Sequence, residues 1–295
     1  MSVSSSESWP IYNSSLKNII ADFQSFCSCV AVSPQQPVIV PATILGSMEV
    51  SCVVVVDRDK SPDQPVIEGV IGGREIAHML VKNTDVWRHF MRVTAREASI
   101  PPSLIAEDNT LADLLNQMSN SGYGVAVVGG LRPRVLDLLI VLRYLRIKSP
   151  AMAMLTKYRA ADFSSRKVLS IGMDFTVRES VHLMLNKGVR RLVVEPSKLI
   201  LSDRSVIGFC FGSIQGMEMI RDNPDALLDQ TIGELGEFLL KPAIIDANDN
   251  LATVLNALLA SEAKCCLLDG GDGIITPWDL SIRLYQKVSA QARPM

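Results

Sequence analysis

A hydroxyl and a carboxylate lie three residues apart near the C-terminus, in the stretch DGGDGIITPWDL (269–280), where a helix is predicted to begin. Thr276 can offer its hydroxyl, and the helix its first backbone N–H groups, to a phosphate. Asp279 can accept hydrogen bonds from the two adjacent hydroxyls of a ribose. The alternative is structural: Thr276 caps the helix, Pro277 fills its first position and Asp279 is an acidic residue of the first turn.

The composition indicates a folded protein with a sizeable core, since 48% of the 295 residues are apolar. No apolar run approaches the roughly 20 residues that span a bilayer, and the N-terminus lacks the features of a secretory signal. We therefore expect a cytoplasmic protein with no membrane partner. The net charge of −2, with no basic stripe, argues against nucleic-acid binding. The six cysteines and three histidines show no metal-binding or catalytic spacing, so we expect no metal site and no catalytic residue.

Four short apolar runs recur at intervals of roughly 70 residues, and each is typical of a buried strand. They are VSCVVVVD (50–57), YGVAVVGG (123–130), VRRLVVEP (189–196) and AKCCLLDG (263–270). An amphipathic helical pattern precedes three of them, over 109–122, 175–188 and 249–263. The first run is preceded only by the shorter segment TILGSMEVS (43–51).

Each repeat also has a predicted first strand, over 37–43, 102–108, 168–174 and 242–248. After each apolar run comes a strand that leads into a last helix. These segments are VIEGVIGGREIAHML (66–80), PRVLDLLIVLRYL (133–145), VIGFCFGSIQGMEMI (206–220) and GIITPWDLSIRLY (273–285). The unit is therefore strand, helix, strand, strand, helix, an α/β (α+β) arrangement. A unit of roughly 60 residues buries little core alone, so we expect repeat one to pair with two, and three with four.

The predicted organisation has six parts. They are a flexible N-terminal tail (1–14), repeat one (15–82), repeat two (91–148), a linker with a helix (149–166), repeat three (167–222) and repeat four (228–288).

This layout resembles the CBS domain family, named after cystathionine β-synthase, in four tandem copies. GIITPWDL (273–280) fits the family pattern of glycine, two apolar residues, threonine or serine, two further residues and aspartate, and GVIGGREI (69–76) is a second match. The arrangement is similar to archaeal stand-alone four-repeat proteins and to the gamma subunit of AMP-activated kinase. The resemblance implies that paired repeats form pseudo-twofold Bateman modules, with clefts that bind adenine nucleotides. It also implies that two modules pack as a disk.

The resemblance implies a ligand site in repeat four. Thr276 and Asp279 would hold phosphate and ribose there, and basic residues of repeat three would reach the phosphate, although a solvated basic turn is the alternative for each of them. Adenine would lie against the first strand, near Ile244 and Ile245. Because side chains alternate between the two faces of a strand, at least one of these isoleucines is expected to belong to the core. Gly273 would let its own strand come close to a neighbour. The further candidates are Ile275, Pro277, Ile244, Ile245, Asp246, Lys187, Arg190 and Arg191.

The other repeats depart from the pattern. In repeat one, Gly72 and Glu75 replace the hydroxyl and the acid, with Ile39 on the predicted first strand, so we expect a weaker site or one for a less charged adenosine derivative. Repeats three and two have Ile214 and Ile140 at the predicted acid position, and Asp137 would repel phosphate in repeat two. These two sites are expected to be empty or to use other contacts. The candidate positions in this comparison are Gly72, Glu75, Ile39, Ile214, Ile140 and Asp137.

The sequence thus predicts a regulatory, energy-sensing protein that binds AMP, ADP or ATP and signals to an unidentified regulated protein, without a catalytic cofactor. Either the two modules of one chain close the disk, or two chains share it as a homodimer. The alternatives are a scaffold whose clefts bind nothing, and a binder of S-adenosylmethionine or another adenosine derivative. An enzyme would need a nucleophile or an acid–base pair, for which we find no motif.

Overall fold

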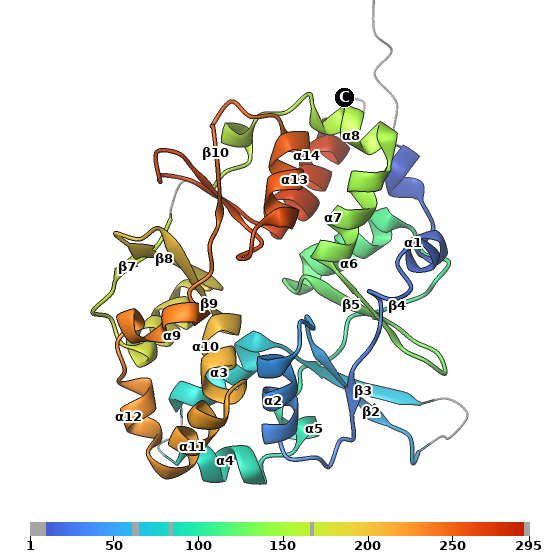
Figure 1. Ribbon diagram of the computed structural model, residues 1–295. Helices are drawn as coiled ribbons and strands as arrows, with labels where there is room; N and C mark the ends of the chain where they lie inside the picture. The colour runs from blue at the N-terminus through green and yellow to red at the C-terminus, as the bar shows by residue number, and fades with distance from the viewer. Residues whose placement is uncertain (1–9, 61–64, 83–84, 166–167, 292–295) are drawn as a thin grey trace, which may run out of the picture. The chain divides into compact units, whose positions relative to one another are not determined.

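The computed structural model describes residues 10–60, 65–82, 85–165 and 168–291, and Figure 1 shows it as a ribbon. It has a mixed α/β fold with four three-stranded sheets. In each sheet the first two strands run parallel and the last two antiparallel. A parallel pair needs a crossover connection, whereas an antiparallel pair can be joined by a short turn. Each repeat therefore has the predicted order of strand, helix, strand, strand, helix.

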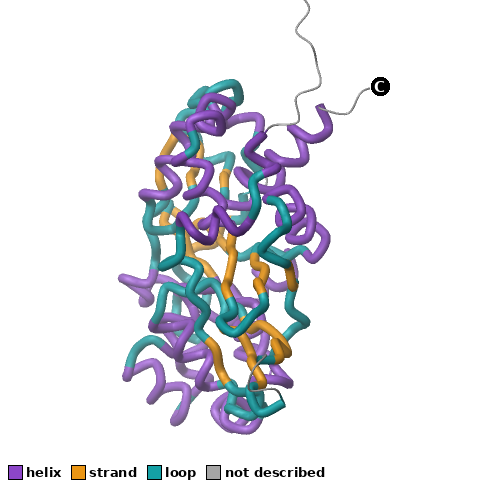
Figure 2. The backbone as a smooth tube through the Cα atoms, turned by 90° about the vertical axis from the view of Figure 1, so that its right-hand side faces the viewer, coloured by secondary structure: helices purple, strands orange, loops and turns teal. Residues whose placement is uncertain are grey.

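The central strand of every sheet is one of the four apolar runs, and Figure 2 shows the strands in orange among the purple helices. Repeat one contains β1 (Ala31–Val32), β2 (Val53–Asp57) and β3 (Val66–Ile71), and repeat two contains β4 (Leu104–Ile105), β5 (Val125–Val128) and β6 (Arg134–Asp137). Repeat three contains β7 (Ser170–Gly172), β8 (Arg191–Glu195) and β9 (Leu199–Ser202), and repeat four contains β10 (Ala243–Ile245), β11 (Cys266–Leu268) and β12 (Ile274–Ile275).

The crossover helices of repeats two, three and four begin at side-chain caps, which satisfy first-turn N–H groups that have no partner in the helix. The caps are Thr110, Thr176 and Asn250. The helices are α6 (Leu111–Ser121), α9 (Val177–Lys187) and α13 (Leu251–Ala260). Their apolar stripes are buried as the helical spacing predicts.

The last helix of each repeat starts directly after the third strand. These helices are α3 (Gly73–Lys82), α7 (Leu138–Ile147) and α10 (Asp203–Phe211), and in repeat four a π-helical turn, η4 (Asp279–Arg283), continues as α14 (Leu284–Gln291). None of the helices in the described part of the chain is long and apolar enough to cross a membrane.

The first strand of repeat one differs from the prediction. Residues 37–43 are not a strand: α2 (Ile39–Ser47) begins there, and the strand is β1, further upstream. A short apolar run without alternation fits a buried helix as well as a buried strand. Pro41 is compatible with the helix because the N–H groups of a first turn have no helical partner. Ile39 therefore begins a helix and does not lie on a strand that could face an adenine ring.

The last strand of repeat three also differs from the prediction. The segment 206–220 forms most of α10 and of α11 (Ile214–Asp222), and the strand is β9, directly before it. The apolar run VIGFCF resembles a strand in composition, but the caps at Ser202 and Ser213 start two helices here. In this register Ser205, and not Ile214, occupies the position of Asp279.

Short helices precede repeat one and join the repeats. They are α1 (Leu16–Asp22), α4 (Val86–Arg92), α5 (Ala95–Ala98), α8 (Ser149–Leu155), α12 (Pro224–Leu228) and the 3-10 helices η2 (Ala160–Asp162) and η3 (Ile232–Phe238). Upstream of α1, the 3-10 helix η1 (Pro10–Asn13) buries Ile11 and Tyr12, so ordered structure begins before residue 15. The rest of the predicted tail, residues 1–9, lies outside the described part of the chain.

The chain divides into two compact units. Unit 1 comprises residues 1–28, 103–167 and 242–295, and so contains repeats two and four; unit 2 comprises 29–102 and 168–241, with repeats one and three. Helices connect the two repeats of each unit: α7 packs against α13 in unit 1, and α10 packs against α2 and α3 in unit 2. Each unit has its own apolar core. The predicted pairing of one with two and three with four concerns contacts between the units and stays a prediction.

Candidate functional site

Thr276 and Asp279 form a capping pair at the start of η4. One carboxylate oxygen of Asp279, Oδ2, accepts from the Thr276 backbone N–H at 2.8 Å and from its hydroxyl at 2.7 Å. Asp279 is only 4% exposed, and Pro277 between the two residues is buried. The Asp279 carboxylate thus satisfies the Thr276 N–H at the helix start, while the Thr276 hydroxyl donates to the same carboxylate. The role of this pair in holding a ligand stays a prediction.

The second oxygen of Asp279, Oδ1, has two donors of its own. Arg283 Nη1 donates to it at 2.7 Å and the Ser165 hydroxyl at 3.5 Å. The same Arg283 nitrogen donates to the Phe163 carbonyl at 3.0 Å. Arg283 and Ser165 are thus functional candidates that the sequence reasoning missed. Of the two, only Arg283 could have been identified from the sequence, because an arginine four residues after an aspartate on a helix is well placed to form an ion pair with it.

The first strand of repeat four offers one exposed isoleucine. Ile244 is 56% exposed, whereas Ile245 is 5% exposed and belongs to the core, which confirms that alternation makes at least one of them core. Ile275 on β12 is also core. Ile244 is therefore an apolar side chain of this sheet that can contact a ring from solvent.

The register of the sheet separates Asp246 from Thr276. Ala243 lies beside Cys266, which in turn lies beside Ile275, and β12 runs opposite to β10. Asp246 thus follows one end of the sheet and Thr276 the other, roughly 13 Å apart along the strands at about 3.3 Å per residue. One small ligand group cannot contact both side chains at once.

Asp246 instead lines a separate hollow of about 380 Å³ in unit 1. The sequence reasoning missed this hollow because three separate stretches of chain line it. Three of its residues are aspartates, so its charge disfavours a phosphate. The lining residues are Ala161, Ser164, Asp246, Ala247, Leu268, Asp269, Gly270 and Asp272.

Gly273 permits a close approach, as predicted. A Cβ atom at this position would lie 3.1 Å from the Cβ of Ser164 and 2.6 Å from Leu268 Cδ1. The neighbouring backbone pairs at the same place, because the Ser165 N–H donates to the Ile274 carbonyl at 2.9 Å. The glycine therefore lets the segment 163–165 lie against β12.

The predicted phosphate-binding residues belong to unit 2. Lys187 is exposed at the end of α9, and Arg191 begins β8. Arg190 Nε donates to Asp203 Oδ2 at 2.8 Å, and Asp203 is buried at the start of α10. Their approach to a ligand in repeat four concerns contacts between the units and stays a prediction.

In the other three repeats, the residues at the Thr276 and Asp279 positions cap the last helix. In repeat one Glu75 accepts from the Gly72 N–H at 2.9 Å, and in repeat two Asp137 accepts from the Ile140 N–H at 2.8 Å. In repeat three the Ser202 hydroxyl accepts from the Ser205 N–H at 3.0 Å. In the described residues a capping pair is thus common to all four repeats, but only repeat four combines a hydroxyl with an acid.

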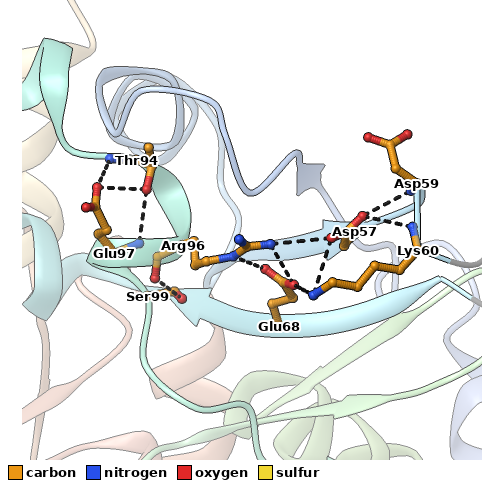
Figure 3. Close-up of polar contacts among 8 residues, drawn as sticks. All are labelled: Asp57, Asp59, Lys60, Glu68, Thr94, Arg96, Glu97 and Ser99. Atoms are coloured by element: carbon orange, nitrogen blue, oxygen red, sulfur yellow. Dashed lines mark hydrogen bonds and ion pairs between the residues drawn. The ribbon is translucent and has the colours of Figure 1, made fainter.

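A second polar cluster lies in repeat one (Figure 3). Arg96 of α5 donates to Glu68 of β3 from Nε at 2.5 Å and from Nη2 at 2.8 Å, and it lies 3.4 Å from Asp57 of β2. Lys60 completes the cluster by pairing with the same two acids. The hydrogen bonds from Arg96 and then Lys60 lower the pKa of Glu68 to about 2. The cluster ties the connector helix α5 to the hairpin of repeat one.

In the described part of the chain the cysteines form no disulfide bonds. Burial raises the pKa of Cys27 and of Cys29 to about 11, so both are protonated at neutral pH. Among the described residues, no group of three histidine, cysteine or acidic side chains is placed to hold a metal ion.

Comparison with known proteins gives one family and one fold. Residues 160–205, which span η2 to the start of α10, match the CBS domain family. A protein of Methanocaldococcus jannaschii, proposed to be an archaeal homologue of gamma-AMPK, has a TM-score of 0.72 at 14% identity, over 89% of this chain and 99% of that one. Among curated proteins, none matches the sequence.

Two further structures are similar over part of the chain. The CBS-pair protein CBSX2 of Arabidopsis thaliana has a TM-score of 0.36 at 16% identity, over 45% of this chain and 97% of that one. The structure of CBSX2 in complex with AMP has a TM-score of 0.33 at 19% identity, over 45% of this chain and 98% of that one. Both scores are below 0.5. The resemblance to the CBS domain family is nevertheless confirmed by the sequence of residues 160–205, and the fold is that of the M. jannaschii protein.

Proposed function

We propose that this chain is a regulatory sensor, and not an enzyme, that binds an adenine nucleotide in repeat four. One observation carries the proposal: a threonine hydroxyl and a buried aspartate lie together at the start of a helix, directly after a buried strand. The helix N-terminus suits a phosphate, and the carboxylate that the Thr276 hydroxyl holds in place suits a ribose diol. Exposed Ile244 on the same sheet supplies an apolar surface for the base.

The remaining contacts follow from the resemblance to the CBS family. Lys187, Arg190 and Arg191 are proposed to neutralise the phosphate, for which the planar fork of arginine is well suited. Binding changes the stability of one arrangement of the protein relative to another, and a regulated partner, or a second copy of the chain, detects the difference. The ligand is AMP, ADP or ATP in this proposal.

A scaffold without a ligand is the second candidate, and one observation favours it. Asp279 already accepts hydrogen bonds from Thr276, Arg283 and Ser165, so the carboxylate is satisfied without a ligand. A buried acid with these partners is sufficient to stabilise the helix start and the segment that packs against it.

Calorimetric titration with AMP, ADP, ATP and S-adenosylmethionine distinguishes the nucleotide sensor from the scaffold without a ligand. The variants are Asp279→Asn, which keeps the size of the side chain, and Thr276→Val, with Asp272→Asn as a control that removes an exposed acid of the same repeat. We expect the parent and the control to bind a nucleotide and the two site variants to lose at least tenfold in affinity, since hydrogen bonds to charged groups contribute about 1.5–3 kcal/mol. Lack of binding by the parent to all four compounds would refute the sensor and leave the scaffold. Binding of S-adenosylmethionine alone would change the ligand class.

A further inference from the structure

We propose that Arg283 competes with the ligand for Asp279 and thereby couples occupancy of the site to the connector segment, Phe163 to Ser165. The inference rests on the proposed function, in which Asp279 accepts the hydroxyls of a ribose. It adds a residue that sets the affinity of the site and a path by which binding changes the protein.

The carboxylate of Asp279 has no acceptor position left. An ionised carboxylate offers about four lone-pair sites. Two are used by the N–H and hydroxyl of Thr276, and two by Arg283 and Ser165. The side chain is also 95% buried, as its exposed fraction is 5%. A diol can therefore bind Asp279 only by replacing donors that the protein itself supplies.

The donors differ in how readily they leave. The two bonds from Thr276 close the start of the helix, and breaking them would leave its backbone N–H and its hydroxyl without this acceptor. The Arg283 side chain is 40% exposed and can turn to water, and the bond from Ser165 is long at 3.5 Å. The ligand is therefore expected to displace Arg283 and Ser165 and to leave Thr276 in place.

The backbone between the two partners is unusual. The Leu284 N–H donates to the Asp279 carbonyl, five residues back, where a regular α-helix would bond four residues back. Such π-helical turns are rare and are frequent at functional sites. Asp279 and Arg283 are the first and last residues of this turn.

Displacing Arg283 also releases the connector segment. Arg283 Nη1 donates to the Phe163 carbonyl at 3.0 Å and contacts the Ser165 hydroxyl at 3.3 Å. The chain enters unit 2 soon afterwards, at Val168. Loss of the Arg283 contacts therefore loosens the segment Phe163 to Ser165, so that a ligand changes the protein beyond its own site.

The first test is titration of the full chain with AMP. Arg283→Gln removes the charge and most of the donors, and Arg143→Gln is the matched control, an arginine of the same unit that lies over the ring of Phe26 at 4.2 Å. We expect Arg283→Gln to bind AMP about tenfold more tightly than the parent, because one hydrogen bond to a charged group no longer has to be broken. The control should bind as the parent does. Equal or weaker binding by Arg283→Gln would overturn the competition and make Arg283 a residue that only positions Asp279.

The second test needs no ligand. Hydrogen exchange of the Ser165 amide, which donates to the Ile274 carbonyl, reports on the connector segment. We expect faster exchange in Arg283→Gln than in the parent, and faster exchange in the parent when AMP is added. Unchanged exchange in the variant would overturn the coupling. If Arg283→Gln does not fold, Arg283→Lys replaces it, since lysine keeps the charge but not the fork of donors.

The two tests separate this inference from the proposed function. Absence of AMP binding by the parent and by all variants overturns the proposed function and the competition together. The exchange of the Ser165 amide without ligand still decides whether Arg283 holds the connector segment.

Discussion

The carboxylate of Asp203 in repeat three packs directly against Gly73 in repeat one. A Cβ atom on Gly73 would lie 2.6 Å from Asp203 Oδ2, closer than Cβ atoms in folded proteins come to other atoms. Gly73 is the first residue of α3 and Asp203 the first of α10, so one carboxylate lies at two helix N-termini, where negative charge is favoured. Arg190 at 2.8 Å balances the buried charge.

Gly73→Ala should therefore destabilise unit 2. The added methyl group must displace a carboxylate that its own helix and Arg190 hold in place, and overpacking of this kind costs about 1–3 kcal/mol. The measurement is the midpoint of urea unfolding. Gly129→Ala is the control, because a Cβ there meets nothing within 4 Å and the substitution should change stability by about 0.5 kcal/mol or less. Equal midpoints for both variants would contradict the close packing.

The Glu68 cluster should make stability depend on pH. Hydrogen bonds from Arg96 and Lys60 lower the pKa of Glu68 from 4.5 to about 2 in the folded state. A lowered pKa stabilises the fold above the unfolded value, and this stabilisation is lost as the pH falls toward the folded value. The parent should therefore be more stable than Glu68→Gln above pH 4.5, and this difference in stability should disappear as the pH falls to about 2. Melting temperatures of both proteins across this range provide the measurement.

Glu107→Gln is the control for this prediction, because Glu107 is exposed. Its melting temperature should follow that of the parent at every pH. A constant difference between the parent and Glu68→Gln down to about pH 2 would show that Glu68 acts through packing and not through its charge.

The cap at Thr176 should contribute measurably to repeat three. Its hydroxyl accepts from the Glu179 N–H at 3.1 Å, and Glu179 bonds back to the Thr176 N–H at 2.9 Å. Thr176→Ala should lower the free energy of unfolding by about 1 kcal/mol, whereas Thr176→Ser keeps the hydroxyl and most of the stability. Chemical denaturation measures both. A serine variant as unstable as the alanine variant would assign the loss to the methyl group and not to the cap.

The regular parts of the fold could be predicted from sequence because two simple signals agree there. The four apolar runs are too short for buried helices and lie next to turns, and α6, α9 and α13 combine an apolar stripe with a capping residue. Around Ile39 and Val206 the apolar residues show no period that distinguishes helix from strand, and there the prediction was wrong. Packing against neighbouring elements decides such segments.

The candidate site was predictable only in part. The spacing of Thr276 and Asp279 identified two residues that hydrogen-bond in the structure. The contact from Ser165, more than a hundred residues upstream, depends on how the connector segment packs against β12. This packing could not be predicted from a single sequence. The separation of Asp246 from Thr276 follows from the opposite directions of β10 and β12, which are evident once the three strands are placed in one sheet.

Lys187, Arg190 and Arg191 should affect nucleotides that carry a phosphate and leave adenosine unchanged. Each alanine variant should lower AMP affinity roughly tenfold if its side chain bonds the phosphate, because hydrogen bonds between charged groups are among the stronger ones. Adenosine has no phosphate, so its affinity should not change. Parallel calorimetric titrations with AMP and adenosine provide the measurement.

Arg190→Ala differs from the other two variants, since Arg190 also balances Asp203. It should lower the melting temperature as well as the AMP affinity, because removing one partner leaves a buried carboxylate without its cation. Lys198→Ala is the control: this lysine of the same repeat pairs with Glu195 at an exposed position, and its loss should change neither property. Equal losses for AMP and adenosine in the Lys187 and Arg191 variants would mean that these residues support the fold of repeat three and do not bind phosphate.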